Sequence, residues 1–202
     1  MAAMSSEPRP LEGVQVHPRA LVETGEVGAG TRVWAFAHLA PGSRVGRDCN
    51  VCDHTFVEGG VVVGDRVTIK SGIYLWDGVT VEDDVFLGPN VVFTNDLYPR
   101  SRRRPEAWTP TLVRAGASVG ANATLVAGIT VGRYAMVGAG AVVTRDVPDF
   151  GLVIGNPARL AGHVGRAGRP LVVDGERGTC PETGEVYLLR DGRCVPADEA
   201  RP

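Results

Sequence analysis

A hydrophobic residue that returns at every sixth position is the strongest constraint on the fold of this chain. Four residues after each of these positions comes a second inward position with a small or branched side chain, and Gly often directly follows the hydrophobic residue. An α-helix needs an apolar period of 3.6, and a half-buried strand needs a period of two. The period of six therefore predicts short strands separated by tight turns. Its members are Val27, Val33, Leu39, Val45, Val51, Val57, Val63, Ile69, Leu75, Val81, Leu87 and Phe93, then Val113, Val119, Leu125, Val131, Val137 and Val143.

The composition agrees with a stack of short strands joined by turns. The 202 residues include 27 Gly and 14 Pro, whereas only 6% are aromatic. Three six-residue units close one triangular coil, so equivalent residues of successive coils stack about 4.8 Å apart. We therefore expect an all-β parallel β-helix of about six or seven coils, with a column of aliphatic side chains at its centre.

The repeat also divides the chain into regions. We expect a flexible N-terminus over residues 1–13, the β-helix over 14–162, and a C-terminal tail with a β-hairpin over 163–202. Within the β-helix, residues 97–112 (LYPRSRRRPEAWTPTL) hold three Pro and four Arg, and prolines cannot continue a flat coil. They predict an extruded loop, which either carries chemistry or is only a solvated, charged insertion.

Charge and hydropathy argue against several classes of protein. The formal net charge of −2 does not favour a general binder of nucleic acid or another polyanion. No apolar run approaches the length of a membrane span, and Met1–Pro10 lacks the basic and apolar regions of a secretion signal. We therefore expect a cytoplasmic protein without membrane contact, whose four Cys are reduced thiols.

Two cysteine motifs invite a metal interpretation that the repeat does not support. Cys49 falls at an inward position and Cys52 at a turn, so their thiols should point differently. Cys180-Pro-Glu-Thr183 resembles half of a zinc-ribbon knuckle with Thr183 in place of the second Cys, and adding Cys194 still leaves too few ligands. We expect no bound metal, and a hairpin that caps the β-helix or contacts a partner.

Three segments in the middle of the chain narrow the family. Cys49–Glu58 (CNVCDHTFVE), Val63–Gly78 (VGDRVTIKSGIYLWDG) and Val81–Asp96 (VEDDVFLGPNVVFTND) closely resemble N-acetyltransferases that act on nucleotide-linked 3-amino-3,6-dideoxyhexoses. Residues 14–160 as a whole resemble the hexapeptide acyltransferases. The resemblance implies left-handed coiling, acetyl-CoA as co-substrate, and a homotrimer with sites between subunits. The nucleotide, dTDP or UDP, stays open.

The segment from Val119 to Arg159 holds the residues expected to bind acetyl-CoA. Gly138 and Gly140 expose backbone that an extended pantetheine arm can approach closely; the alternative is that these glycines serve only the turns. Gly155-Asn-Pro-Ala-Arg159 resembles the element that closes over the CoA nucleotide, and guanidinium groups suit its phosphates. The expected set is Gly120, Gly138, Ala139, Gly140, Arg145, Asn156, Pro157 and Arg159.

One column of stacked residues carries the candidate catalytic groups. His54, Gly72 and Asn90 are each 18 residues apart, so the glycine should leave a gap between two polar side chains, where a sugar amine could enter. The resemblance implies that Asn90 holds the amine or the oxyanion. His54 is the candidate base, but in some relatives the departing thiolate takes the proton and no side-chain base is needed.

Further polar and aromatic residues should gather at the same corner of the coil, just before the basic loop. Carboxylates and amides there can hold the sugar, arginines can pair with the diphosphate, and Trp76 or Trp108 can stack on a sugar or base. Surface arginines are, however, commonly only solvated. The expected substrate-binding residues are Glu58, Trp76, Asp77, Asn95, Asp96, Arg100 and Arg102.

The sequence therefore predicts a sugar-nucleotide N-acetyltransferase in which the amine attacks the thioester directly. Three alternatives stay open. One is a hexapeptide acyltransferase with a different acceptor. Another is a β-helical carbonic anhydrase, although the four His (His17, His38, His54 and His163) lack the close pair that its zinc needs. The third is a scaffold protein, which has no use for the motif from Gly138 to Arg159.

Overall fold

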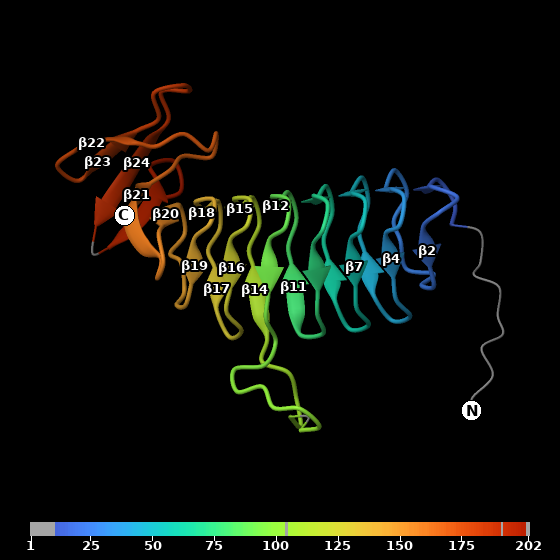
Figure 1. The fold of residues 1–202 in the computed structure, drawn as a ribbon. Coiled ribbons are helices and arrows are strands. Elements are labelled where there is room, and N and C mark those ends of the chain that lie inside the picture. Colours follow the sequence, from blue (N-terminus) through green and yellow to red (C-terminus); the bar gives the residue numbers. More distant parts are fainter. Residues whose placement is uncertain (1–10, 104, 191, 201–202) are drawn as a thin grey trace.

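The chain winds into a long parallel β-solenoid with a loop on one side and a small sheet at one end (Figure 1). The computed structural model describes residues 11–200 except 104 and 191, so most of the predicted flexible segment 1–13 lies outside the described residues. Within those limits every regular element is a strand, which confirms the predicted all-β fold. The same residues contain no helix long and apolar enough to cross a membrane.

Face 1 of the solenoid has eight parallel strands, closed by one antiparallel strand. The last turn raises the count above the six or seven coils expected, because parallel pairing continues beyond the final member of the repeat, Val143, to Val153. The strands are β1 (Gln15–Val16), β3 (Arg32–Val33), β6 (Asn50–Val51), β9 (Thr68–Ile69), β12 (Phe86–Leu87), β15 (Ser118–Val119), β18 (Met136–Val137), β20 (Gly151–Ile154) and the antiparallel β21 (Arg159–His163).

Faces 2 and 3 complete each triangular turn. Face 2 contains β2 (Leu21–Val22), β4 (His38–Leu39), β7 (Phe56–Val57), β10 (Tyr74–Leu75), β13 (Val92–Phe93), β16 (Thr124–Leu125) and β19 (Val142–Val143). Face 3 contains β5 (Arg44–Val45), β8 (Val62–Val63), β11 (Val79–Val81), β14 (Thr111–Val113) and β17 (Thr130–Val131), extended at its ends by isolated bridges at Val27 and Val147.

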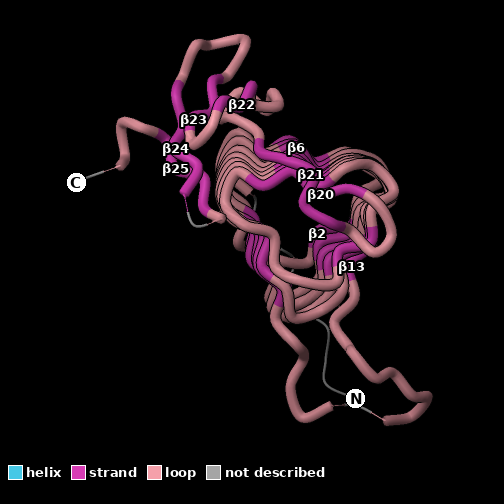
Figure 2. The backbone as a smooth tube through the Cα atoms, turned by 90° about the vertical axis from the view of Figure 1, so that its left-hand side faces the viewer, coloured by secondary structure: helices cyan, strands magenta, loops and turns pink. Residues whose placement is uncertain are grey.

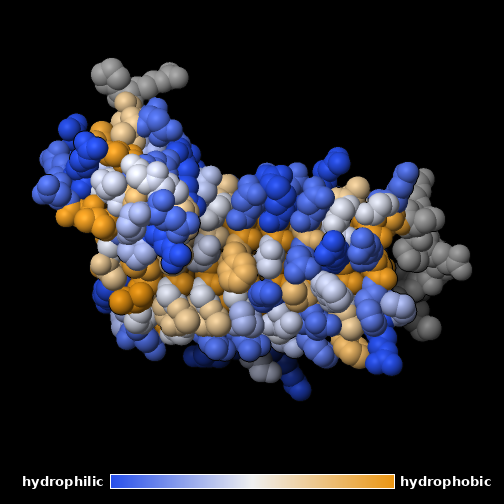
Figure 3. All heavy atoms as spheres, turned by 90° about the horizontal axis from the view of Figure 1, so that it is seen from above, coloured by the Kyte–Doolittle hydropathy of each residue, from blue (hydrophilic) through white to orange (hydrophobic). Residues whose placement is uncertain are grey.

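The core is the column of side chains that the repeat predicts. Val33, Val51, Ile69 and Leu87 succeed one another in register along face 1, and each is at most 2% exposed. The second inward positions are equally buried. Seen from the side of face 1, hydrophobic residues form only a narrow line between rows of hydrophilic side chains (Figure 3).

Each corner of the coil turns through a residue with positive φ. At the corner between faces 1 and 2, which we call the first corner, these residues form a column with φ between 57° and 76°. A side chain in this region costs about 1–2 kcal/mol relative to ordinary backbone, so non-glycine residues there are uncommon. The column is Phe36, His54, Gly72, Asn90, Asn122 and Gly140.

The extruded loop leaves the second corner, between faces 2 and 3, where it separates β13 from β14 (Figure 2). Its base is tied down by backbone hydrogen bonds, in which Thr109 N donates to Asn95 O and Thr111 N to Gly78 O. Its arginine-rich tip is exposed. The predicted loop is therefore present as a projection on a fixed base.

The C-terminal residues form a folded sheet of four strands, whereas the sequence suggested only a tail with a hairpin. The antiparallel strands are β22 (Val172–Asp174), β23 (Arg177–Thr179), β24 (Val186–Arg190) and β25 (Arg193–Pro196). Tyr187 is fully buried and packs edge-on against Phe150, which stacks on Tyr134 of the solenoid. Arg133 of the solenoid also pairs with Glu199. These aromatic and ionic contacts hold the sheet against the third corner, between faces 3 and 1.

Neighbouring residues of one strand provide a test of the core. Leu87→Ala removes a fully buried side chain and should lower the free energy of unfolding by about 2–5 kcal/mol. Phe86→Ala, at the adjacent and 41% exposed position, should cost about 1 kcal/mol or less. Urea unfolding followed by circular dichroism measures both. Equal losses would contradict the assignment of inward and outward positions.

Candidate functional site

His54, Gly72 and Asn90 do stack on the first corner, as the sequence predicts. Each turn is linked to the one before it by a backbone hydrogen bond, from Gly72 N to Asp53 O at 3.2 Å and from Asn90 N to Ser71 O at 3.0 Å. The side chains of His54 and Asn90 are exposed on this corner. The solenoid therefore presents both polar groups to solvent along one line.

The expected gap above Gly72 is occupied, which corrects the sequence-based view of that position. A Cβ atom on Gly72 would lie only 2.3 Å from Oδ1 of Asn90. The carboxamide of Asn90 therefore leans over the glycine, toward the turn that carries His54. The glycine makes room for the amide oxygen of Asn90, and an incoming amine must approach that oxygen from the solvent side.

An aromatic cleft of about 370 Å³ lies beside this column, on face 2. His54 forms one wall of it and stacks on Phe36, with ring centroids 5.0 Å apart. Trp76 belongs to the opposite wall and contacts Tyr74 and Phe56. The lining residues are Phe36, His38, His54, Thr55, Phe56, Tyr74 and Trp76.

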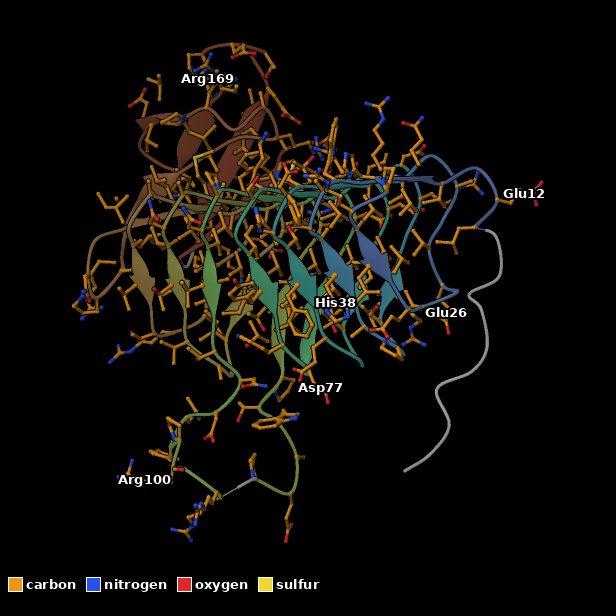
Figure 4. All side chains as sticks on the ribbon, turned by 45° about the vertical axis from the view of Figure 1, so that its right-hand side comes forward. Glu12, Glu26, His38, Asp77, Arg100 and Arg169 are labelled. Atoms are coloured by element: carbon orange, nitrogen blue, oxygen red, sulfur yellow. The ribbon has the colours of Figure 1, made fainter. Side chains whose placement is uncertain are left out.

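Most of this cleft was missed by sequence reasoning, although a signal was present. His38, Phe56 and Tyr74 occupy the same outward position of three successive turns, so ring-bearing side chains recur at 18-residue spacing. His38 was not among the candidate site residues predicted from the sequence. The structure places His38 in the cleft (Figure 4). Its Nε2 lies 2.7 Å from Glu23 Oε2, so the carboxylate orients the ring.

The predicted sugar-binding carboxylates lie at the second corner and not beside His54 and Asn90. The four-residue interval between His54 and Glu58 spans about 13 Å of extended chain, which is the width of face 2. Glu58 Oε2 accepts a hydrogen bond from Asp77 N at 2.8 Å, and Asn95 Nδ2 donates to Asp77 O at 3.4 Å. The expectation of one convergent corner is therefore wrong, since the strand of face 2 separates the two groups.

These second-corner residues support the base of the loop. Asp96 Oδ1 accepts a hydrogen bond from Tyr98 N, and Thr94 Oγ1 accepts one from Ala127 N. A second cleft, of about 460 Å³, lies between Asp77, Gly78 and loop residues 105–108, including Trp108. The polar groups here bond mainly to backbone, so they fix the position from which the loop projects.

Arg100 and Arg102 lie on the projecting part of the loop. Both are exposed, and Arg100 donates a hydrogen bond to the carbonyl of its neighbour Pro99. Figure 4 shows Arg100 far out on the loop and Asp77 where the loop leaves the solenoid. Within one chain these guanidinium groups therefore do not join the first-corner column.

Packing of the coils explains two of the glycines that were expected to contact CoA. A Cβ atom on Gly120 would lie 2.5 Å from the backbone nitrogen of Ala139, and one on Gly138 would lie 2.8 Å from the side chain of Ile154. Gly140 differs, because a Cβ there would meet no atom within 4 Å, although its φ of 69° favours glycine. Open space above exposed backbone is therefore found at Gly140, next to the exposed Ala139.

The turn between β20 and β21 brings the other expected CoA residues to the same end of the solenoid. Val142 N donates to Gly155 O at 3.0 Å, and Ala158 N donates to Val142 O at 2.8 Å. The turn holding Asn156 and Pro157 is therefore fastened to β19, the strand that leads to Arg145. Arg145 and Arg159 are both exposed there.

The cysteines and histidines of the described residues form no metal-binding group. Cys49 is 2% exposed inside the solenoid, whereas Cys52 is partly exposed on face 1, so the two thiols do point differently as predicted. Cys180 and Cys194 are buried in the small hydrophobic core of the C-terminal sheet. Burial also lowers the pKa of His163, which favours a neutral imidazole at pH 7.

Comparisons with known proteins agree with this architecture. Residues 115–145 match the family described as "Hexapeptide repeat of succinyl-transferase". The dTDP-3-amino-3,6-dideoxy-alpha-D-galactopyranose 3-N-acetyltransferase of Aneurinibacillus thermoaerophilus is 54% identical over 177 residues, which cover 88% of this chain and 92% of that protein. The bifunctional protein GlmU of Nitratidesulfovibrio vulgaris (strain DP4) is 32% identical over 155 residues, 72% of this chain and 34% of GlmU.

Among solved structures, the hexapeptide-repeat acetyltransferase VCA0836 of Vibrio cholerae O1 biovar eltor, in complex with acetyl coenzyme A, superposes with a TM-score of 0.53. The identity is 29%, over 60% of this chain and 70% of that one. The solenoid and its repeat thus define a hexapeptide-repeat acetyltransferase. More narrowly, the chain belongs to the family of the Aneurinibacillus 3-N-acetyltransferase, because the identity extends over nearly all of both chains.

Gly120 allows the packing explanation to be separated from a role in binding CoA. Gly120→Ala should lower the free energy of unfolding by about 2–3 kcal/mol, because its methyl group would press on backbone of the next turn. Gly162→Ala, where a Cβ meets nothing within 4 Å, should stay within about 0.5 kcal/mol. Urea unfolding measures both changes. A Gly120→Ala protein of normal stability but raised KM for acetyl-CoA would favour the CoA explanation instead.

Proposed function

We propose that this protein transfers the acetyl group of acetyl-CoA to the 3-amine of a dTDP-linked 3-amino-3,6-dideoxyhexose. The observation that carries the proposal is the 54% identity, over 92% of its length, to an enzyme named for this reaction. The first corner supports it, because it aligns an exposed amide, Asn90, with the open backbone at Gly140. Uracil in place of thymine is the nearest alternative for the nucleotide.

Acetyl-CoA runs along the first corner at the C-terminal end of the solenoid. Asn90 and Gly140 are two turns apart in the column, which corresponds to about 10 Å. The pantetheine arm lies against the exposed backbone of Ala139 and Gly140, and its nucleotide reaches the turn at Asn156 and Pro157. Arg159 meets the phosphates there, since a guanidinium fork matches phosphate oxygens, whereas Arg145 follows β19 at the second corner, across face 2. The thioester thereby comes to lie near Asn90.

Asn90 orients the acceptor amine. Its Oδ1 is a hydrogen-bond acceptor with no charge, so it binds an N–H of a neutral amine without favouring the ammonium form. The amine nitrogen keeps its lone pair for attack on the thioester carbon. The tetrahedral intermediate then collapses, the C–S bond breaks, and the surplus proton on nitrogen passes to the CoA thiolate. No group outside the two substrates is needed to balance this reaction.

His54 positions the substrate in this proposal and does not act as the base. Its ring is stacked on Phe36 and lies on the far side of Gly72 from Asn90, two turns or about 10 Å along the column. A general base must come within about 3 Å of the proton that it removes, or act through one water. An amine bound at Asn90 Oδ1 is one turn closer, which still leaves about 5 Å to the His54 turn. That distance is too long for direct proton transfer, so in this proposal His54 contacts other atoms of the acceptor.

The whole proposal is tested with a panel of acceptors. Purified protein is given acetyl-CoA and dTDP- or UDP-linked sugars that carry the amine at C3 or C4, and the release of free thiol is followed. We expect turnover of a dTDP-linked 3-amino sugar with the highest kcat/KM. Failure to acetylate any member of the panel would refute the proposed acceptor class.

Two substitutions separate the roles of Asn90 and His54. Asn90→Ala should lower kcat about 100-fold, the usual loss when one positioned polar group is removed from an active site. His54→Ala should lower kcat about tenfold or less, because loss of a true general base costs more. Comparable losses in the two variants would instead make His54 the base.

A matched control exists at the third corner. Asp48 has a φ of 54° and stands over Gly30, as Asn90 stands over Gly72. Asp48→Ala therefore removes an equivalent corner side chain away from the proposed site and should leave kcat unchanged. A loss in this control as large as that of Asn90→Ala would indicate general damage to the coil.

We further propose a homotrimer in which face 2 contacts a neighbouring subunit. The outward positions of this face carry no Asp, Glu, Lys or Arg over seven turns, and Leu21, Tyr74 and Val92 are about half exposed in the single chain. Depletion of charge is typical of the centre of an interface. The residues are Leu21, His38, Phe56, Tyr74, Val92, Thr124 and Val142. An adjacent subunit would also bring its Arg100 and Arg102 within reach of an acceptor diphosphate.

The subunit contact is tested by placing a charge on each of two faces. Val92→Arg puts a cation on face 2 and should reduce the mass in solution from that of a trimer to that of one chain, since an unpaired charge is costly in an interface. Val62→Arg puts the same cation at the outward position of face 3 and should leave the trimer intact. Light scattering on a sizing column measures both masses. Dissociation of only the face 3 variant would contradict the assignment.

A further inference from the structure

The four-stranded C-terminal sheet is not used by the proposed chemistry, but it follows closely on the turn that meets CoA. β21 begins just after that turn and leads into the sheet. We infer that the sheet holds β21 in place, and that β21 in turn positions Arg159 and the turn at Asn156 for binding of CoA. This role rests on the proposed function and gives the C-terminal residues a part in it.

β21 is weakly held along its own length. It is the last strand of face 1, and among the described residues its one strand partner is β20. The register between the two strands is interrupted at Leu152 and Val153. Leu160 is 50% exposed, and Arg159 and Ala161 are also exposed. A strand with so few buried contacts opens locally with a small free-energy change, so its position depends on what holds its two ends.

The turn before β21 and the strand itself cross the C-terminal end of face 1. At the first corner, Ala158 N donates a hydrogen bond to Val142 O at 2.8 Å. Figure 2, which views the solenoid from its C-terminal end, shows β20 and β21 at the front and the sheet of β22 to β25 to one side. We call residues 155–163 the end segment. The expected CoA residues lie at its first-corner end, and the sheet adjoins its other end.

The other end of this segment is fastened at the third corner. Val164 N donates to Phe150 O at 2.8 Å. Leu171 N, from the residue before β22, donates to His163 O at 2.9 Å. The chain that connects β21 to the sheet is therefore bonded both to the last corner of the solenoid and to β21 itself.

Tyr187 of β24 joins the sheet to the same corner. Its ring is fully buried and packs edge-on against Phe150, with centroids 5.3 Å apart. Phe150 is in turn stacked on Tyr134 of the preceding turn. The Tyr187 hydroxyl also accepts a hydrogen bond from Arg166 N at 2.8 Å, in the chain that follows β21. Removing this ring should therefore release the connection after β21 together with the sheet.

Ion pairs add to this contact near the end of the sheet. Glu199, which follows β25, accepts hydrogen bonds from Arg133 of the solenoid and from Arg166. The bond from Arg133 lowers the pKa of the Glu199 carboxyl, so the carboxylate is ionised at neutral pH. Partly exposed ion pairs contribute little stability on their own. Two arginines on one carboxylate nevertheless fix where this part of the sheet lies.

Release of the end segment should affect CoA and not the acceptor. A segment freed at the third corner occupies its binding position for only part of the time, and the apparent Kd for CoA rises as that fraction falls. Asn90 lies three turns before Gly155 along the first corner, about 14 Å away, so binding of the acceptor should not change. A loss confined to CoA therefore distinguishes positioning of the end segment from general loss of structure.

The experiment measures binding of CoA to the full chain by calorimetry, and hydrogen exchange of residues 155–163 by mass spectrometry. Tyr187→Ala should raise the Kd for CoA about tenfold, which corresponds to an end segment in place about a tenth of the time. Its amides should exchange about tenfold faster, whereas those of β12 and β13 should keep their wild-type protection. The KM for the acceptor should stay within about twofold of the wild type.

Glu199→Lys provides the same test without altering a buried side chain. The new cation faces Arg133 and Arg166, so charge repulsion should displace this part of the sheet and raise the Kd for CoA about threefold or more. The variant keeps the aromatic core of the sheet intact, and circular dichroism should show an unchanged content of strand.

Two controls use the same sheet. Tyr187→Phe keeps the buried ring and loses only the hydroxyl, so its Kd for CoA should lie within about threefold of the wild type. Val172→Ala shortens a side chain of β22 that is 64% exposed. This variant should leave both the Kd for CoA and the exchange of the end segment unchanged.

A Kd for CoA within about twofold of the wild type in both Tyr187→Ala and Glu199→Lys would overturn the inference, whatever the exchange rates. Equal losses of affinity for CoA and for the acceptor would also overturn it, since general damage explains them. Either result leaves the proposed function standing if the wild type binds CoA and acetylates a nucleotide-linked amino sugar. A wild type that binds no CoA would refute the proposed function itself, and with it any positioning of CoA by the sheet.

Discussion

The parallel backbone ladder between successive turns is the interaction on which the rest of this structure depends. Each turn donates and accepts hydrogen bonds along three faces, so Val33, Val51 and Ile69 must lie directly in register. A slip of one residue in any turn would exchange inward and outward positions for that whole turn. The regular repeat therefore serves hydrogen bonding and burial together. The columns of surface residues, including the one with Asn90, are a consequence of that register.

The corners between the strands carry the candidate catalytic residues. A flat coil can turn sharply only where one residue has positive φ, and glycine adopts this at the lowest cost. His54 and Asn90 occupy such positions without being glycine, at a cost that regular packing must offset. Gly72 between them leaves the space into which the Asn90 carboxamide leans. Positive φ alone does not mark a functional residue, because Asp48 at the third corner shares it. His54 and Asn90 are distinguished by sharing their column with the open backbone at Gly140.

Much of this arrangement could be predicted from the sequence. The repeat shows which positions within a coil point inward, and it also shows which residues of successive coils stack on one another. The inward positions, an extruded loop within residues 97–112 and the column of His54, Gly72 and Asn90 all follow from counting in steps of six and 18, although β14 already begins at Thr111. The number of turns was underestimated, since the last coil departs from the repeat while still pairing. The four-stranded C-terminal sheet lies outside the repeat, and its docking on Phe150 depends on tertiary contacts that no periodicity reports.

The site was less predictable than the fold, because the repeat does not give distances across a face or the directions of side chains. Counting gives the column of a residue but not the width of a face, so Glu58 and Asp77 were assigned to the same corner as Asn90. The repeat also does not give the direction of side chains: only the structure shows that Asn90 leans over Gly72 and that packing of the next turn requires Gly120.

The ladder of turns also limits how the spacing within such a protein can change. A whole added or deleted coil moves everything on one side of it by a single step of about 4.8 Å, so the backbone offers only coarse adjustment of the spacing between donor and acceptor. Finer adjustment, of the size that distinguishes one hexose from another, is left to individual side chains on the corners.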